Sequence, residues 1–161
     1  MIGKKIRIER VVDRNTGKTV IIPMDHGVTV GPVSGLTNMQ QTIRSVALGG
    51  ANAIVMHKGL VETALKSRGE LGLILHLSAS TQIGIDQNSK TLICTVEEAI
   101  KLGADAISIH VNLGTDEERS MLRDLGTVSR AAMEWGMPLL AGRHCAGGKA
   151  RQGSSQRHRE S

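Results

Sequence analysis

Residues 48–57 read Leu-Gly-Gly-Ala-Asn-Ala-Ile-Val-Met-His, and residues 102–110 read Leu-Gly-Ala-Asp-Ala-Ile-Ser-Ile-His. Each copy begins where a helix would close on a glycine, because only glycine takes the left-handed position after a helix at little cost. An Ala-Asx-Ala turn and a short apolar strand that ends in histidine then follow. Residues 135–141, Trp-Gly-Met-Pro-Leu-Leu-Ala, are a looser third copy. Repeated helix–turn–strand units of this size predict a parallel sheet with helices outside it.

Five strands are predicted in all, and the first of them is a β-branched, apolar run that is typical of a parallel strand covered on both faces. The strands are expected at about 19–24, 53–57, 71–77, 106–111 and 138–141, and the helices near 37–48, 60–67, 95–102 and 116–135. A glycine- and proline-bearing loop is expected at 27–35 and a long polar loop at 78–91.

An eight-stranded (β/α) barrel typically takes ~250 residues, so the apolar part of this chain corresponds to roughly five of eight units. A doubly wound open sheet is the alternative. The first strand–helix junction, residues 25–31, lacks the glycine spacing of a dinucleotide-binding fold. We therefore predict the α/β class, and within it an incomplete (β/α)8 TIM barrel.

The chain changes character between Ala141 and Gly142. Residues 142–161 contain no Val, Ile, Leu, Met or aromatic residue, and they carry five Lys/Arg against one acid. Such a stretch cannot bury enough apolar area to offset its ordering entropy. The sequence thus predicts a barrel part over 1–141 and a disordered basic C-terminal tail over 142–161.

Composition excludes several function classes. Four of the five net positive charges come from the tail, since residues 1–141 hold 15 Lys/Arg and 14 Asp/Glu. With Trp135 as its only aromatic residue, the chain lacks a stacking platform for bases, and no nucleic-acid partner is expected. Two cysteines form no disulfide or zinc pattern. No signal peptide or membrane segment is evident, so a cytoplasmic location is expected.

Polar side chains stand where the predicted strands end, which is where active sites of such barrels lie. The strand-end residues are Asp25, His26, His57, Lys58, His76, Ser78, His110, Asn112, Arg143 and His144. Four converging imidazoles could bind zinc or iron, with Asp25 as a further ligand. No His-x-His or Glu-x-x-His pair is present, however, and a lone histidine is more often a hydrogen-bonding residue. A metal-dependent barrel enzyme is the weaker interpretation, and no metal ligand is assigned.

Lys58 and Asp25 are the two candidates for covalent and proton-transfer chemistry. A lysine desolvated in a barrel mouth can form a Schiff base with a carbonyl substrate, although a solvent-facing or anion-contacting lysine is commoner. Asp25 is the stronger candidate, because a carboxylate between an apolar strand and a glycine loop is poorly solvated and well placed to move a proton. Its alternative role is to cap the following loop.

Several segments between about Lys4 and Ala141 together form a specific combination. They are Asp-Arg-Asn-Thr-Gly (13–17), Val-Ile-Ile-Pro-Met-Asp-His-Gly (20–27) with Val-Gly-Pro (30–32), Gly-Gly-Ala-Asn-Ala (49–53), His-Lys-Gly (57–59), His-Leu-Ser (76–78), Cys-Thr-Val-Glu-Glu-Ala (94–99) and Leu-Gly-Ala-Asp-Ala (102–106) with Ser-Ile-His-Val-Asn (108–112). This combination resembles the archaeal-type class I aldolase family. That family includes fructose-bisphosphate aldolases and 2-amino-3,7-dideoxy-D-threo-hept-6-ulosonate synthase, which serves an early step of aromatic amino-acid biosynthesis. Residues 23–32 look closest to the synthase branch.

The resemblance implies a (β/α)8 barrel that acts through a lysine Schiff base and needs no cofactor. In the family the iminium accepts electrons while a carbon–carbon bond of a phosphorylated ketose breaks, and an aspartate after strand one and a tyrosine after strand five move protons. Asp25 matches that aspartate. The adjoining substrate-binding loop matches Asp25, His26, Gly27, Val28 and Thr29. The synthase would transfer a three-carbon carbanion to aspartate semialdehyde, and intact relatives are expected to be homo-oligomers.

Two departures from the family pattern bear on activity. The tyrosine should fall near position 144, where this chain has His144, and the chain contains no Tyr. The Schiff-base lysine belongs to strand six, which is absent, and Lys149 in the polar tail cannot replace it. We therefore expect a catalytically inactive relative of the synthase, truncated after about strand five. A fragment of a fructose-bisphosphate aldolase and a non-catalytic fragment that acts by association are the alternatives.

The tail itself resembles translation that continues in a wrong reading frame. The nucleotide sequence around codon 142 tests this expectation.

Overall fold

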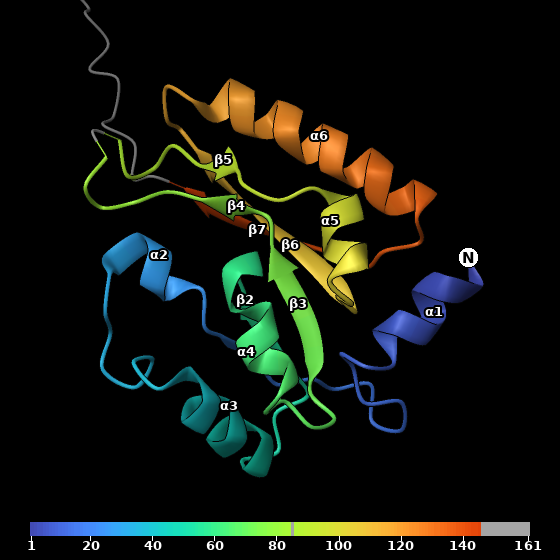
Figure 1. Cartoon of the computed structure of the whole chain (residues 1–161). Coiled ribbons are helices and arrows are strands. Elements are labelled where there is room, and N and C mark those ends of the chain that lie inside the picture. The colour runs from blue at the N-terminus through green and yellow to red at the C-terminus, as the bar shows by residue number, and fades with distance from the viewer. Residues whose placement is uncertain (85, 146–161) are drawn as a thin grey trace, which may run out of the picture.

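Five parallel strands form one curled sheet in the computed structural model, which describes residues 1–84 and 86–145 (Figure 1). The strand order is β1-β2-β3-β6-β7, so each strand pairs with the next one along the chain apart from the short β4 and β5. The bounds are Ile21–Pro23 (β1), Ala53–Met56 (β2), Gly72–His76 (β3), Ala106–Leu113 (β6) and Leu139–Cys145 (β7). The sheet curls like part of a barrel wall, which confirms the predicted incomplete TIM barrel.

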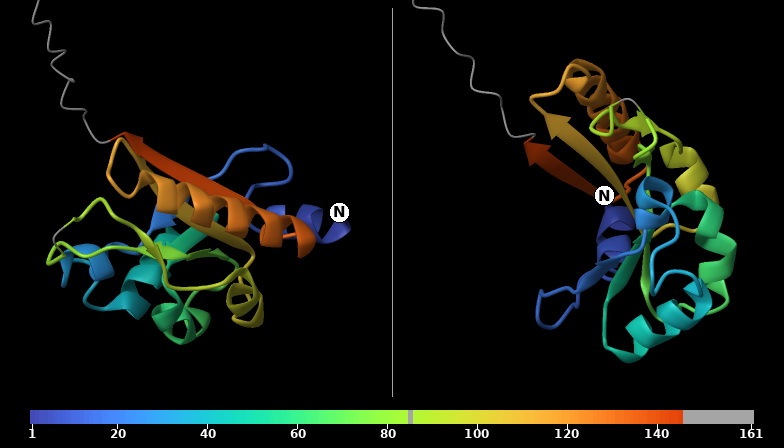
Figure 2. Two further views of the ribbon diagram at one scale, coloured as in Figure 1. Left: turned by 90° about the horizontal axis from the view of Figure 1, so that it is seen from above. Right: turned by 90° about the vertical axis from the view of Figure 1, so that its left-hand side faces the viewer.

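The helices that connect these strands cover the outer face of the curl (Figure 2). They are α3 (Met39–Leu48), η1 (Lys58–Leu60), α4 (Val61–Leu65), α5 (Val96–Lys101) and α6 (Glu118–Glu134). All four predicted helices are thus present, although several are shorter than expected. Among the described residues no helix is long and apolar enough to cross a membrane.

Four elements were not expected from the sequence. The N-terminal residues form α1 (Ile2–Ile8), and the first predicted loop contains the short helix α2 (His26–Val30). The predicted polar loop contains the antiparallel pair β4 (Ser78–Ala79) and β5 (Thr91–Leu92). Helices and strands this short carry too few residues for a periodic apolar pattern, so tertiary contacts determine them.

The predicted boundary at Ala141 lies inside β7. This strand continues to Cys145, and the backbone of 142–145 pairs with residues 110–113 of β6. A parallel neighbour supplies backbone partners whatever the side chains are, which is why the polar composition of 142–145 does not end the strand. The rest of the predicted tail, 146–161, lies outside the described residues.

The Asx residue of each repeat ties its strand to the strand before it in the sheet. Asn52 Oδ1 accepts a hydrogen bond from the backbone N–H of Val20 (2.8 Å), and the Asn52 N–H donates to the Val20 carbonyl (2.9 Å). Asp105 repeats this arrangement with Leu73, at 2.9 Å and 2.8 Å. The Asp105 carboxylate also pairs with Arg10 and Arg68, each at 3.2 Å. The Ala-Asx-Ala turn therefore fixes the register of neighbouring strands.

Two apolar clusters lie on the two faces of the sheet. The larger one fills the space between the sheet and the outer helices and includes Ile54, Leu73 and Ile107. The smaller one lies on the inner face and consists of Val11, Ala53, Val55, Ile74 and Ala106. Strand residues therefore alternate between the two clusters, as parallel strands covered on both faces must.

The segment after α1 crosses the inner face at Gly72. A Cβ atom at this position would overlap the carbonyl oxygen of Arg10 and would lie 3.3 Å from Val11 Cγ2. Glycine is therefore required here so that the N-terminal segment can pack against β3 and place Val11 in the inner cluster.

Replacing Gly72 with alanine should lower the free energy of unfolding by about 2–3 kcal/mol, because the new methyl group collides with backbone rather than with a movable side chain. Gly126, in the exposed part of α6, has no neighbour within 4 Å of its Cβ position. Gly126→Ala is the matched control and should stabilise the protein by about 0.5–1 kcal/mol. Urea denaturation of the two variants measures both effects, and equal stabilities would contradict the close packing of residues 10–11 on β3.

Candidate functional site

Strand alternation places the polar strand-end side chains on the inner face of the sheet. His76 lies two residues after Ile74, and Ser108 and His110 lie two and four residues after Ala106. The residues two apart on a strand share a face, so these three point the same way as the inner apolar cluster. Asp25 and His57 follow β1 and β2 in the same phase. Six of the ten strand-end residues named from the sequence therefore lie together, whereas Lys58, Asn112, Arg143 and His144 do not line the same cavity.

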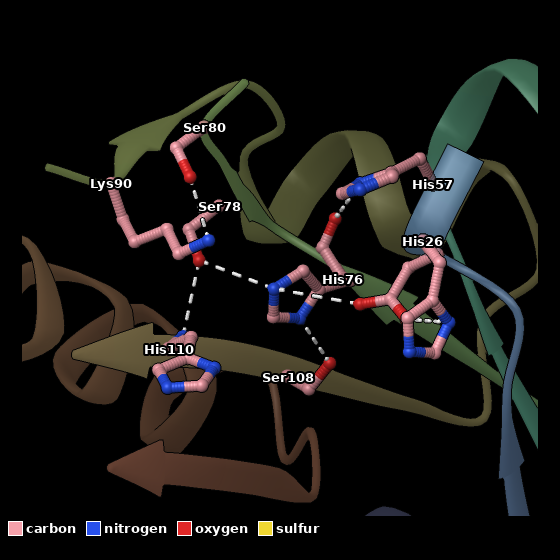
Figure 3. A network of polar contacts seen from close by, with 9 residues as sticks. His26, His57, His76, Ser78, Ser80, Lys90, Ser108 and His110 are labelled. Carbon is pink, nitrogen blue, oxygen red and sulfur yellow. Dashed lines mark hydrogen bonds and ion pairs between the residues drawn. The ribbon is translucent and has the colours of Figure 1, made fainter. Parts of the chain in front are cut away.

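These side chains enclose a cavity of about 230 Å³ at the carboxyl ends of the strands. Figure 3 shows the polar network around it. The lining residues are Asp25, His26, Thr29, Val30, His57, His76, Ser78, Ala79, Lys90 and His110. Of the five predicted substrate-loop residues, three border this cavity, while Gly27 and Val28 line a larger groove beside it.

Asp25 is held at the N-terminal end of α2 with its carboxylate directed to the histidines. One oxygen, Oδ2, lies 3.8 Å from His76 Nε2, and the other lies 3.9 Å from His26 Nδ1. The side chain is 22% exposed. Asp25 makes no side-chain hydrogen bond to the end of α2, so it does not act as the structural cap that was the alternative. Its oxygens are free to take or give a proton in the cavity.

His76 is the centre of the hydrogen-bonded network. Its Nδ1 is hydrogen-bonded to Ser108 Oγ (2.8 Å), and Ser78 Oγ lies 3.4 Å from its Nε2. Ser78 Oγ also accepts from the backbone N–H of His110 (3.1 Å), which connects β6 to the start of β4. The imidazole of His76 thus lies between a hydroxyl and a carboxylate, each fixed by a different strand.

Burial controls the ionisation of this cluster. Desolvation lowers the pKa of His76 to about 4, and the Asp25 carboxylate opposes this shift only in part. Burial likewise lowers the pKa of His110 and the pKa of Lys90. Burial therefore favours the neutral form of the His76 and His110 imidazoles in the cavity.

Lys90 is the main site residue that the sequence did not reveal. It precedes β5 in the predicted polar loop, and its Nζ donates a hydrogen bond to Ser80 Oγ (2.7 Å). The antiparallel pairing of β4 with β5 folds the loop back over the mouth, and the Gln82 N–H donates to the Thr29 carbonyl of α2 (3.0 Å). The sequence feature that could have indicated Lys90 is its position immediately before the apolar run Thr-Leu-Ile-Cys (91–94).

Lys58 does not lie in this cavity. It is the first residue of η1, and its Nζ forms an ion pair with Glu98 Oε1 at 3.0 Å. Both side chains are partly exposed, at 40% and 46%. Lys58 borders the neighbouring groove of about 1000 Å³, which shares Asp25 and His57 with the cavity. Lys58 thus follows the end of β2, and its amine is paired with a carboxylate.

The metal interpretation gains no support from the geometry. His57 Nδ1 donates to the backbone carbonyl of His76 (3.2 Å), and the two rings are tilted with centroids 5.4 Å apart. The ring nitrogens of His57 and His76 are thus turned to hydrogen-bond partners rather than to one point. Within 1–84 and 86–145, no group of three His, Cys, Asp or Glu side chains is arranged to hold a metal ion.

Comparison with known proteins gives a consistent result. A sequence profile of the DeoC/LacD family aldolases matches residues 19–156. The chain is 40% identical over 139 residues to 2-amino-3,7-dideoxy-D-threo-hept-6-ulosonate synthase of Halobacterium salinarum, covering 86% of this chain and 52% of the relative. It is 37% identical over 140 residues to 2-amino-4,5-dihydroxy-6-oxo-7-(phosphonooxy)heptanoate synthase of Streptomyces griseus, covering 86% and 51%. The chain spans about half the length of these curated relatives.

Solved structures show the same likeness in three dimensions. An archaeal fructose 1,6-bisphosphate aldolase superimposes with a TM-score of 0.80 at 27% identity, over 91% of this chain and 59% of that one. Another archaeal fructose-1,6-bisphosphate aldolase, with its catalytic Lys covalently bound to the carbinolamine intermediate of the substrate, gives a TM-score of 0.76 at 27% identity over the same shares.

His76 should stay neutral from about pH 5 to about pH 8, where an unperturbed histidine would change its charge. Because Asp25 favours the imidazolium, Asp25→Asn should lower the pKa of His76 further. Titration of the His76 ring resonances by NMR measures both effects. Asp116→Asn, outside the cavity, is the control and should leave His76 unchanged. A His76 ring that titrates at its ordinary value would show that the site is not desolvated.

Proposed function

This chain belongs to the DeoC/LacD aldolase family, and we propose that it carries part of the active site of a Schiff-base aldolase. This part contains the residues that move protons. Within the family we assign the chain to the branch of 2-amino-3,7-dideoxy-D-threo-hept-6-ulosonate synthase. The observation that carries the proposal is Asp25. Its carboxylate follows β1 and points into a partly closed polar cavity at the mouth of the barrel wall. The relatives named as this synthase support the choice of branch.

In the proposed reaction Asp25 acts on the hydroxyl group of a phosphorylated ketose. The carboxylate takes the hydroxyl proton when the adjacent carbon–carbon bond breaks, and it returns this proton when the new bond forms. His76 stays neutral beside it, so the imidazole can donate a hydrogen bond to the reacting oxygen without adding a charge. Residues 25–29 form the wall against which the substrate lies, through His26 and Thr29 on one side and Gly27 and Val28 on the other.

We further propose that the 161-residue polypeptide does not complete this reaction by itself. Aldol cleavage through an imine needs an uncharged amine that faces the substrate carbonyl. Lys58 is paired with Glu98, and Lys90 is hydrogen-bonded within its own hairpin. The chain also has no tyrosine to serve as the second proton-transfer group, and His144 stands in β7 opposite Asn112 instead.

A class I fructose-bisphosphate aldolase is the second candidate. It is favoured by the superposition of the archaeal fructose-bisphosphate aldolases on the curled sheet at TM-scores of 0.80 and 0.76. The higher sequence identity to the synthases, 40% against 27%, is the reason to prefer the synthase branch.

Borohydride trapping tests the lack of a self-sufficient amine. The purified chain is incubated with dihydroxyacetone phosphate, reduced with sodium borohydride and examined by intact-mass spectrometry. We expect no covalent adduct, whereas a Schiff-base fructose-bisphosphate aldolase treated in parallel should be labelled. A stable adduct on Lys58 or Lys90, located by peptide mapping, would overturn this part of the proposal.

A chimera tests the role of Asp25 directly. Residues 1–141 of this chain are joined to the remaining C-terminal part of the Halobacterium salinarum synthase, so that the synthase supplies the residue at position 144 and the Schiff-base lysine. This chimera should restore synthase activity. Asp25→Asn in the chimera should lower kcat by about 10²–10⁴-fold, the usual contribution of a general acid–base group. Asp116→Asn should leave kcat unchanged. A folded chimera that cleaves fructose 1,6-bisphosphate but performs no synthase reaction would favour the second candidate.

A further inference from the structure

Lys90 is a partly buried cation whose charge has no carboxylate partner among the described residues. Its one hydrogen bond there goes to Ser80 Oγ, although an ammonium group has three N–H donors. The ammonium group is partly removed from water, and this burial lowers the pKa of Lys90. A cation in this situation is stabilised by an anion that arrives from outside. The Ser80 hydroxyl bonds in turn to the Gln87 carbonyl (2.9 Å), so the hairpin holds the amine in place.

His110 offers a second unmet group at the same place. Its Nε2 is buried and has no hydrogen-bond partner within the described part of the chain. A buried polar atom without a partner costs free energy, and a ligand oxygen could supply the missing bond. His110 lines the cavity together with Lys90 and Ser78.

The two residues lie apart from the proton-transfer group. In Figure 3, Lys90 and His110 are on one side of His76, and His26, the neighbour of Asp25 in the sequence, is on the other. Asp25 Oδ2 lies 3.8 Å from His76 Nε2. The Asp25 charge favours the ammonium form of Lys90, but the two side chains form no ion pair within 4 Å. The cavity therefore has an acidic end and a basic end, separated by a neutral imidazole.

We propose that Lys90 and His110 bind an oxyanion of the substrate, a phosphate or a carboxylate, at the end of the cavity remote from Asp25. The proposal rests on the proposed function and adds to it the residues that orient the ligand. The names of two of the similar proteins describe compounds with an anion at each end: two phosphates in fructose 1,6-bisphosphate, and a heptanoate carboxylate with a 7-phosphonooxy group. The name of the Halobacterium salinarum synthase describes a carboxylate alone. One anion on Lys90 would leave a ligand hydroxyl facing Asp25.

Calorimetry on the full 161-residue chain tests this site with three probes. Inorganic phosphate reports any oxyanion site, glycerol 3-phosphate represents the phosphate end, and L-homoserine represents the aminated carboxylate end. Loss of a charged hydrogen bond is worth about 1.5–3 kcal/mol, so Lys90→Met should weaken binding by about 10-fold or more. Lys90→Arg keeps the charge and should bind within about threefold of the parent chain. Lys58→Met is the matched control and should bind like the parent chain.

The relative affinities of the two organic probes then identify the source of the anion. Tighter Lys90-dependent binding of glycerol 3-phosphate assigns the phosphate end, and tighter binding of L-homoserine assigns the carboxylate end. Addition of phosphate should also shift the ring resonances of His110 in NMR spectra of the parent chain and not in those of Lys90→Met. Circular dichroism confirms that the variants are folded.

Three results would overturn the inference. One is equal phosphate affinity in the parent chain and Lys90→Met, and another is no detectable binding of any probe to the parent chain. The third is a borohydride-trapped adduct on Lys90 together with loss of phosphate binding in Lys90→Arg, which would make Lys90 a nucleophile instead. Failure of the chimera to show aldol chemistry would refute the proposed function and leave a measured anion site intact.

Discussion

Register is the constraint on which the rest of this structure depends, and two Asx side chains set it. Asn52 accepts from and donates to the backbone of Val20, immediately before β1, and Asp105 does the same with Leu73 in β3. A slip of one residue in a parallel strand would move its whole inner set of side chains to the outer face. The bonds at the amino ends of the strands therefore decide that His57, His76 and His110 meet at the carboxyl ends.

The two ends of the sheet consequently have different chemistry. At the amino ends the buried carboxylate of Asp105 is fully engaged with Arg10, Arg68 and a backbone N–H, so it stabilises and does not react. At the carboxyl ends, and within the part of the chain that the structure describes, Asp25 forms ion-pair contacts with two histidines near 4 Å, and Lys90 has a single serine partner. The Asp105 charge, which has several hydrogen-bond and ion-pair partners, stabilises the fold. The charges of Asp25 and Lys90, which have few partners, are available to a ligand.

Much of this arrangement could be predicted from the sequence, because it depends on local patterns. The internal repeat predicts the parallel sheet, and the strand ends predict Asp25, His57, His76 and His110 as neighbours. Lys90 could not be placed, since a lysine in a polar loop approaches the site only through the β4–β5 pairing and the contact of Gln82 with Thr29. The ion pair of Lys58 with Glu98 joins residues 40 positions apart, and no local pattern reports such a contact.

The inner apolar cluster fills the inner face of the sheet on the amino-terminal side of the strand-end residues. It therefore limits how deeply a molecule can enter from the carboxyl ends of the strands. Ile74 and Ala106 lie only two residues beneath His76 and Ser108, which is about 6–7 Å along a strand. Val11, held over Gly72 by the N-terminal segment, occupies the same layer. A molecule bound at this opening would therefore have only a few of its atoms below the polar strand-end residues. Recognition at this opening would then depend on the spacing of the ligand's polar groups along the strand-end residues and not on how deeply the ligand enters.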